Sequence, residues 1–158
     1  MSFVIGIDPG AGGAVAILER NGDLVQVFDM PSVDLVAGGK LKRRVSPEML
    51  AAELRLYNIH GTCAYIEQVG AMPGQGVSSM FAFGEAFGLA KGVLAGLGIP
   101  VQSVPPAKWK RALGLNAGKD AARAKAAALW PHQAGEFKRV KDDGKAEAAL
   151  IAKWGCGL

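Results

Sequence analysis

The sequence predicts an α/β fold in which helices flank a mixed sheet of five strands. Three apolar runs within residues 1–30 are joined by short turns, a pattern typical of an antiparallel meander. Two further apolar runs, later in the chain, alternate with segments of helical spacing and add two strands to the sheet. The 158 residues are enough for one domain of this kind with a buried core.

The first predicted strand ends in an acid. Residues 3–7 are apolar, and Asp8 follows them directly, before a turn that contains Pro9 and three glycines. An apolar run bounded by turn residues is typical of a strand that is buried on both faces. A carboxylate at that place is costly to bury unless a cation meets it. Asp8 is therefore a candidate ligand-binding residue, with the capping of a turn as the alternative.

Two more strands complete the predicted meander. Residues 14–19 are expected to return antiparallel to the first strand, and residues 24–30 to form the third strand after a turn at residues 21–23. Residues 31–44 lack clear periodicity and are predicted to form an exposed loop, with a basic cluster over residues 40–44. Such a cluster is usually a solvated face, and a contact with phosphate is the alternative.

A second predicted strand also ends in an acid. The triplet Ser-Pro-Glu opens residues 46–58 and predicts a helix there. Residues 62–67 then form a fourth strand, which ends at Glu67 and is followed by a glycine-rich loop. Because ligands collect at strand ends in an α/β sheet, this repetition of the pattern around Asp8 indicates one shared site.

A long helix is predicted to begin with Ser78 or Ser79 as its cap and to end near Gly96. Glycines recur along it at every fourth residue: Gly84, Gly88, Gly92 and Gly96. Each interior glycine costs roughly 1 kcal/mol relative to alanine, so we expect this face to pack closely against the sheet or against a partner helix. Two charged residues and five glycines interrupt residues 80–99, which favours a buried helix over a membrane span.

The last third of the chain is predicted to be helical and basic. It contains a fifth strand and three helices, over residues 101–104, 107–113, 120–129 and 142–153. Residues 137–141 are expected to form a basic linker before the last helix. Within that helix Asp143 and Glu147 are four residues apart, so their carboxylates face the same way. A helix start that simply favours acids is the alternative.

The composition favours a polyanionic partner and a reducing compartment. The chain has 18 Lys and Arg against 14 Asp and Glu, a formal net charge of +4. Cys63 and Cys156 have neither the spacing of metal ligands nor that of a disulfide framework. No basic lead precedes residues 3–7, so we expect no signal peptide. The cytoplasm is the expected location, that of a bacterial host if the chain is phage-encoded.

Four acids are thus candidates for one site: Asp8, Glu67, Asp143 and Glu147. Crowded carboxylates without His or Cys favour Mg²⁺ or Mn²⁺ bound through oxygen. Two such ions can activate a water and stabilise the leaving oxygen of a phosphodiester. Basic segments around the site would hold the flanking phosphates. The residues therefore predict a metal-dependent phosphodiesterase that acts on nucleic acid and needs no small-molecule cofactor.

Four segments resemble the RuvC-type Holliday junction resolvases, and most closely their phage or prophage members. They are residues 5–10, 65–69, 84–88 and 146–152. Together they cover essentially the whole chain, in the family's order and at similar spacing. The resemblance implies a ribonuclease-H-like fold, with residues 1–158 as a single nuclease domain. It also implies a homodimer that makes paired, Mg²⁺-dependent nicks across a four-way DNA junction.

The resemblance assigns roles to the acids by position. Asp8 matches the family's first acid, Glu67 the second and Glu147 the last, while Asp143 best matches the third. The last acid is Glu where the bacterial enzymes have Asp, and the third lies four residues before it instead of three. Asp142 is therefore an alternative to Asp143 as the third metal ligand.

The resemblance also locates residues around the acids. The family's DNA-binding region corresponds here to Lys108, Lys110, Arg111, Lys119 and Arg123. Gln68 is expected to orient Glu67 or a metal-bound water. Bacterial members carry an aromatic residue that acts at the junction centre three residues after the second acid, where this chain has Gly70. Met72 is a candidate substitute for it.

Other functions fit parts of the pattern. A broader nuclease that cuts flaps and forks shares the four acids, and a related nuclease that processes ribosomal RNA precursors shares the Asp-Pro-Gly turn. A junction-binding protein without catalysis is the alternative from a different class. The same turn resembles the phosphate loop of actin-like ATPases, but those need two such domains, and this chain is too short for both.

Overall fold

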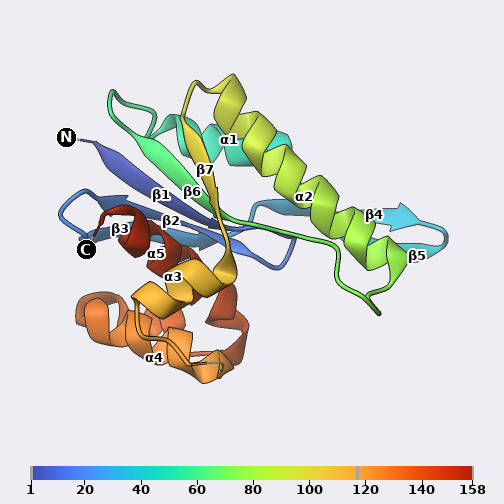
Figure 1. Ribbon diagram of the computed structural model, residues 1–158. Helices are drawn as coiled ribbons and strands as arrows, with labels where there is room; N and C mark the ends of the chain where they lie inside the picture. Colours follow the sequence, from blue (N-terminus) through green and yellow to red (C-terminus); the bar gives the residue numbers. More distant parts are fainter. Residues whose placement is uncertain (1, 117, 158) are drawn as a thin grey trace.

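The computed structural model describes residues 2–116 and 118–157 (Figure 1). Within them, a five-stranded sheet has the strand order β3-β2-β1-β6-β7. Its strands are Phe3–Asp8 (β1), Ala14–Glu19 (β2), Leu24–Asp29 (β3), Cys63–Glu67 (β6) and Val101–Val104 (β7). The first three pair antiparallel, whereas β6 is parallel to both β1 and β7. The predicted mixed sheet is therefore confirmed.

The central strand β1 is buried on both faces, as predicted. Its side chains alternate between two cores, because successive residues of a strand point to opposite faces. Ile5 and Ile7 lie in a core with residues of α1 (Pro47–Arg55) and α2 (Val77–Gly96). Val4 lies in the other core, with residues of α5 (Asp143–Gly155).

The helices form two layers, one on each face of the sheet (Figure 1). The layer of α1 and α2 packs on one face. The other contains α3 (Pro106–Ala112), α4 (Lys119–Leu129) and α5, and two 3₁₀ turns, Pro131–Phe137 and Val140–Asp142, join α4 to α5. The second turn overlaps the end of the segment predicted to be a basic linker, residues 137–141, and includes Asp142, which was predicted to begin the last helix.

Helix α5 packs very closely against β1. A Cβ atom on Gly6 would lie 2.0 Å from the carbonyl oxygen of Ala148 and 2.5 Å from the backbone nitrogen of Ala152. Only glycine fits there, and the sheet-facing side of α5 is correspondingly built from small residues. This contact sets the position of Glu147 relative to the end of β1.

The prediction for residues 31–44 was wrong. The segment is not a loop but part of a two-stranded hairpin, β4 (Ser32–Ala37) and β5 (Lys40–Val45). Gly38 and Gly39 connect the strands with φ of 59° and 71°, the geometry of a tight two-residue turn. Most residues of both strands are exposed. Because the hairpin lacks a buried face, its sequence shows no alternation from which it could be predicted.

The predicted cap of α2 was wrong, and of the two packing partners expected for its glycine face, the structure excludes the sheet and leaves the partner helix untested. The helix follows Gly76 without a side-chain cap, so neither Ser78 nor Ser79 caps it. The glycine face (Gly84, Gly88, Gly92 and Gly96) does not pack on the sheet: these glycines are exposed, and a Cβ on any of them would meet no atom within 4 Å. Ala86, Ala90 and Leu94 make the buried face instead.

Among the described residues, we find no helix that combines the length and the hydropathy needed to cross a membrane.

Candidate active site

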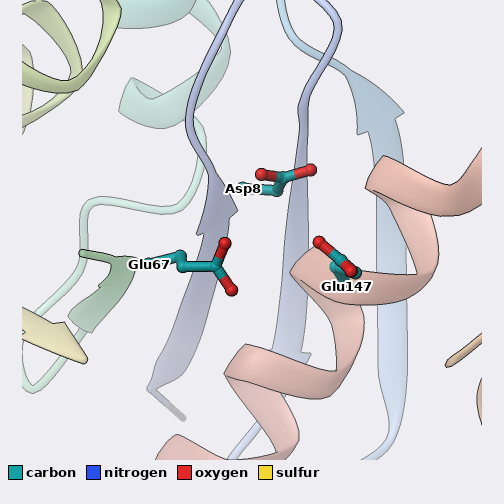
Figure 2. Close-up of side chains that lie close together, drawn as sticks. All are labelled: Asp8, Glu67 and Glu147. Carbon is teal, nitrogen blue, oxygen red and sulfur yellow. The ribbon is translucent and has the colours of Figure 1, made fainter. Parts of the chain in front are cut away.

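Three of the four predicted acids converge at one edge of the sheet (Figure 2). Asp8 ends β1, Glu67 ends the parallel neighbour β6, and Glu147 lies on α5. One carboxylate oxygen from each of the three lies within 4.8 Å of the other two. The strand ends meet because Ile7 pairs with Ile66 in parallel register, and the close approach of α5 to β1 brings Glu147 beside them.

The cluster concentrates negative charge in a half-buried place. Burial, followed by the nearby charges of Glu147 and Glu67, raises the pKa of Asp8 well above its ordinary value. Burial likewise raises the pKa of Glu67, which a hydrogen bond from Trp109 partly opposes. A cation among the three carboxylates would relieve this repulsion. The all-oxygen donor set fits Mg²⁺ or Mn²⁺.

The fourth acid, Asp143, occupies a neighbouring position. With Asp8 and Glu147 it lines a cavity of about 270 Å³. Its Oδ1 accepts a hydrogen bond from Arg123 Nε at 2.7 Å. The Asp143 carboxylate is therefore already paired with a positively charged side chain of the protein. Asp143 thus borders the site without belonging to the close group of three.

The alternative third ligand, Asp142, is directed elsewhere. It is 1% exposed, and its carboxylate accepts hydrogen bonds from the Arg139 guanidinium and backbone, at 2.8 Å from both Nη2 and N. These bonds hold the pKa of Asp142 below its ordinary value. Of the two candidates, Asp143 is the one that lines the cavity beside Asp8 and Glu147.

The basic residues predicted to bind DNA fall into two groups. Lys110 and Arg123 contact the acids: Lys110 Nζ lies 3.3 Å from Glu147 Oε1, and Arg123 pairs with Asp143 and Asp120. Lys110 also lowers the pKa of both Asp8 and Glu67, against the larger upward effects.

Among the described side chains, Lys108 and Arg111 form no ion pair with the four acids. Lys108 Nζ lies 5.5 Å from the centre of the Trp154 ring, and Arg111 is exposed on α3. The side chain of Lys119 is outside the described part of the structure. The DNA-binding role of all five basic residues stays a prediction.

Sequence reasoning missed Trp109. Its indole is fully buried, and Nε1 donates a hydrogen bond of 2.8 Å to Glu67 Oε2. Trp109 therefore orients Glu67. Gln68 is exposed and lines a cavity together with Glu67, and the orienting role expected of it stays a prediction. An aromatic residue within a basic helix that directly follows a strand was the available signal.

We expect Trp109→Phe to weaken divalent-metal binding about 10-fold or more, the usual cost of losing a partner that orients a metal ligand. Calorimetric titration with Mn²⁺ measures this. Trp130→Phe is the matched control, because Trp130 is also buried and donates its indole N–H to the Gly22 carbonyl, in contacts that involve none of the acids. Equal metal affinity in the two variants would contradict the role of Trp109.

Divalent metal should also stabilise the fold. A ligand that binds only the folded state at 100 times its Kd adds about 2.7 kcal/mol, so Mg²⁺ or Mn²⁺ should raise the Tm by several degrees. Glu147→Gln should remove most of this shift, whereas Glu136→Gln, at an acid paired with Lys145, should keep it. Scanning calorimetry with and without EDTA provides the measurement. An unchanged shift in Glu147→Gln would argue against a metal at this site.

Comparison with known proteins gives a partial sequence match. No family model matches the chain. Over 95 residues, 59% of the chain, it is 39% identical to the chloroplastic Holliday junction resolvase MOC1 of Chlamydomonas reinhardtii. The chain spans only 11% of the length of that relative.

Solved structures of RuvC from Thermus thermophilus have a similar fold. The structure in complex with a Holliday junction substrate aligns over 98% of this chain and 95% of its own, with a TM-score of 0.63 at 16% identity. A second structure aligns over 97% and 95%, with a TM-score of 0.53 at 19% identity. The chain therefore has the ribonuclease-H-like fold of the RuvC resolvases, and its predicted resemblance to them is confirmed.

Proposed function

We propose that residues 1–158 form a single RuvC-like nuclease domain that resolves four-way DNA junctions by hydrolysing phosphodiesters. The observation that carries the proposal is the convergence of Asp8, Glu67 and Glu147 within 4.8 Å at the edge of a RuvC-type sheet. The name of the Chlamydomonas relative and the junction DNA bound in one RuvC structure support the same substrate.

In this proposal Asp8, Glu67 and Glu147 hold two Mg²⁺ ions, with Mn²⁺ as a substitute and Asp143 as a fourth ligand. Bound ions would supply an activated water and charge stabilisation of the leaving oxygen. The chain's own residues prepare the site. Trp109 fixes the orientation of Glu67 through its indole N–H.

Basic residues complete the proposed site. Lys110, next to Glu147, places a positive charge at the edge of the cluster, where a phosphate can reach it. Arg123 holds Asp143 in place. We propose that Lys108, Arg111 and Lys119 contact the flanking phosphates of the DNA, together with Lys110 and Arg123 once substrate is bound.

Paired nicks require two active sites, and a four-way junction has two-fold symmetry, so we propose a homodimer. The glycine face of α2 is the surface proposed for it, because it is exposed and lets a second backbone approach closely. We expect Gly88→Arg to shift the dimer to monomer in sedimentation with junction DNA present. Ala52→Arg, at an exposed position of α1, is the control. A wild-type monomer on the junction would contradict paired cleavage.

A comparison of substrates separates the proposed function from its alternatives. Junction, duplex, flap, fork and RNA of matched sequence are incubated with the protein and Mg²⁺ or Mn²⁺. Preferred cutting of the junction supports a resolvase. Equal cutting of flaps and forks would indicate a debranching nuclease, and preferred cutting of RNA an RNA-processing enzyme. Tight binding of the junction without any cut would indicate a non-catalytic binding protein.

The site of action in this proposal is the cytoplasm, which agrees with two free thiols, Cys63 and Cys156. A phage or prophage origin stays a prediction from the resemblance alone.

A further inference from the structure

A second cavity, of about 450 Å³, shares Asp8 with the acid cluster. Its walls come from the turn between β1 and β2, the end of β5 and the first half of α2. The volume lies in the range of sites that bind a small molecule or one nucleotide. The polar and aromatic side chains that matter here are Arg43, Arg44, Phe83 and Glu85.

Phe83 is the aromatic wall of this cavity. It is 41% exposed, although it is a large apolar residue beside a charged site. Its ring lies against the turn that follows Asp8: a Cβ on Gly10 would be 3.3 Å from the ring edge. Gly10 has φ of 115°, which favours glycine. The turn therefore packs closely against the Phe83 ring, and a glycine at position 10 allows this contact.

The same ring borders a third cavity, of about 230 Å³, which Glu67 also lines. Phe83 thus lies between two hollows, one reaching Asp8 and the other Glu67. A flat apolar ring at this place is suited to stacking against a base whose backbone passes the acids.

Two arginines of β5 also line this cavity and form what we call its basic wall. Arg44 lies 4.0 Å from Glu85 of α2, and Arg43 lies 3.8 Å from Asp34 of β4. Both pairs are long and partly exposed, so they contribute little and leave the guanidinium groups available. Arginine is well suited to binding phosphate through two parallel N–H donors.

We propose that this cavity binds one unstacked nucleotide of the strand that is cut, with its base stacked on Phe83 and its phosphates against Arg43 and Arg44. The proposal rests on the proposed function, and it adds a subsite that positions the strand beside Asp8. It also gives the β4–β5 hairpin a role, because the end of β5 supplies both arginines.

The test is a scan with abasic sites. A junction carries a single abasic site at each position near the branch point in turn, and binding is measured in EDTA, so that no cleavage occurs. At one position, wild type and Phe83→Tyr should lose about 5- to 100-fold in affinity, the worth of stacking one base. Phe83→Leu should bind the intact junction more weakly and lose nothing further at that position.

The basic wall has an independent readout. Arg43→Gln and Arg44→Gln should each reduce the slope of log K against log salt concentration by about one, the signature of a lost phosphate contact. Arg55→Gln is the matched control, since Arg55 is exposed at the end of α1 and does not line the cavity. If the salt slopes of Arg43→Gln and Arg44→Gln equal that of Arg55→Gln, the two arginines do not contact phosphate.

The outcomes separate the subsite from the function. If no abasic position distinguishes Phe83→Leu from wild type, the subsite is wrong, even if wild type cuts junctions. If the scan gives the expected position but Mg²⁺ or Mn²⁺ produces no cut, the subsite stands and the proposed function fails. A protein that binds no branched DNA would overturn both. Thermal melting of each variant shows whether it is folded.

Discussion

Asp8→Asn should abolish cleavage and leave junction binding unchanged. The substitution removes a carboxylate from the cluster of three but keeps the size of the side chain and the basic surface around it. Metal-ion catalysis supplies several kcal/mol, so the rate should fall by about 10³-fold or more. Single-turnover cleavage and a binding assay in EDTA measure the two effects. Asp23→Asn, in the turn between β2 and β3, is the control.

The thermal stability of Asp8→Asn tests whether a charged Asp8 destabilises the fold when no metal is bound. Because the pKa of Asp8 is raised in the folded state, its protonated form stabilises the fold below the unfolded pKa. That stabilisation is lost as pH rises through the folded pKa. In EDTA, Asp8→Asn should therefore melt at a higher temperature than wild type at neutral pH, with no difference in acid. In the binding assay, loss of junction binding by Asp8→Asn with an unchanged circular dichroism spectrum would contradict the assignment of Asp8 as a metal ligand.

Gly6→Ala should cost about 3 kcal/mol of folding free energy, at the upper end of the usual cost of overpacking. The new Cβ would meet backbone atoms of Ala148 and Ala152 at 2.0 and 2.5 Å, and backbone cannot rotate out of the way. Relief requires α5 to move off the sheet, which also moves Glu147 away from Asp8. The variant should therefore lose both stability and metal affinity.

Urea denaturation measures the stability of Gly6→Ala. Gly135→Ala is the control, because a Cβ there would meet nothing within 4 Å, and it should change the free energy of unfolding by less than about 0.5 kcal/mol. Equal denaturation midpoints for the two variants would show that α5 tolerates displacement. The close contact between α5 and β1 would then not determine where Glu147 lies.

The sequence predicts the core of the site because its signals are local. Asp8 and Glu67 each end an apolar strand, and parallel strand ends in one sheet lie together. That placement needs only strand boundaries and topology. Glu147 follows from helical spacing and from the family resemblance, which places the last acid beside the first two.

The parts that were missed depend on contacts distant in the chain. The hydrogen bond from Trp109 to Glu67 joins residues 42 positions apart, and no periodicity encodes it. Arg123 looks like a surface cation in the sequence but pairs with Asp143. The sequence also could not show what the glycine face of α2 contacts, because small residues are compatible with a sheet, a partner helix or solvent.

The most direct test of paired junction cleavage is the position of the cuts in a four-way junction labelled on each strand. With Mg²⁺ or Mn²⁺, we expect two nicks placed symmetrically in opposing strands, giving duplexes that ligase can reseal. Nicks in a single strand, unrelated positions in the two strands, or a bound junction left intact would contradict it.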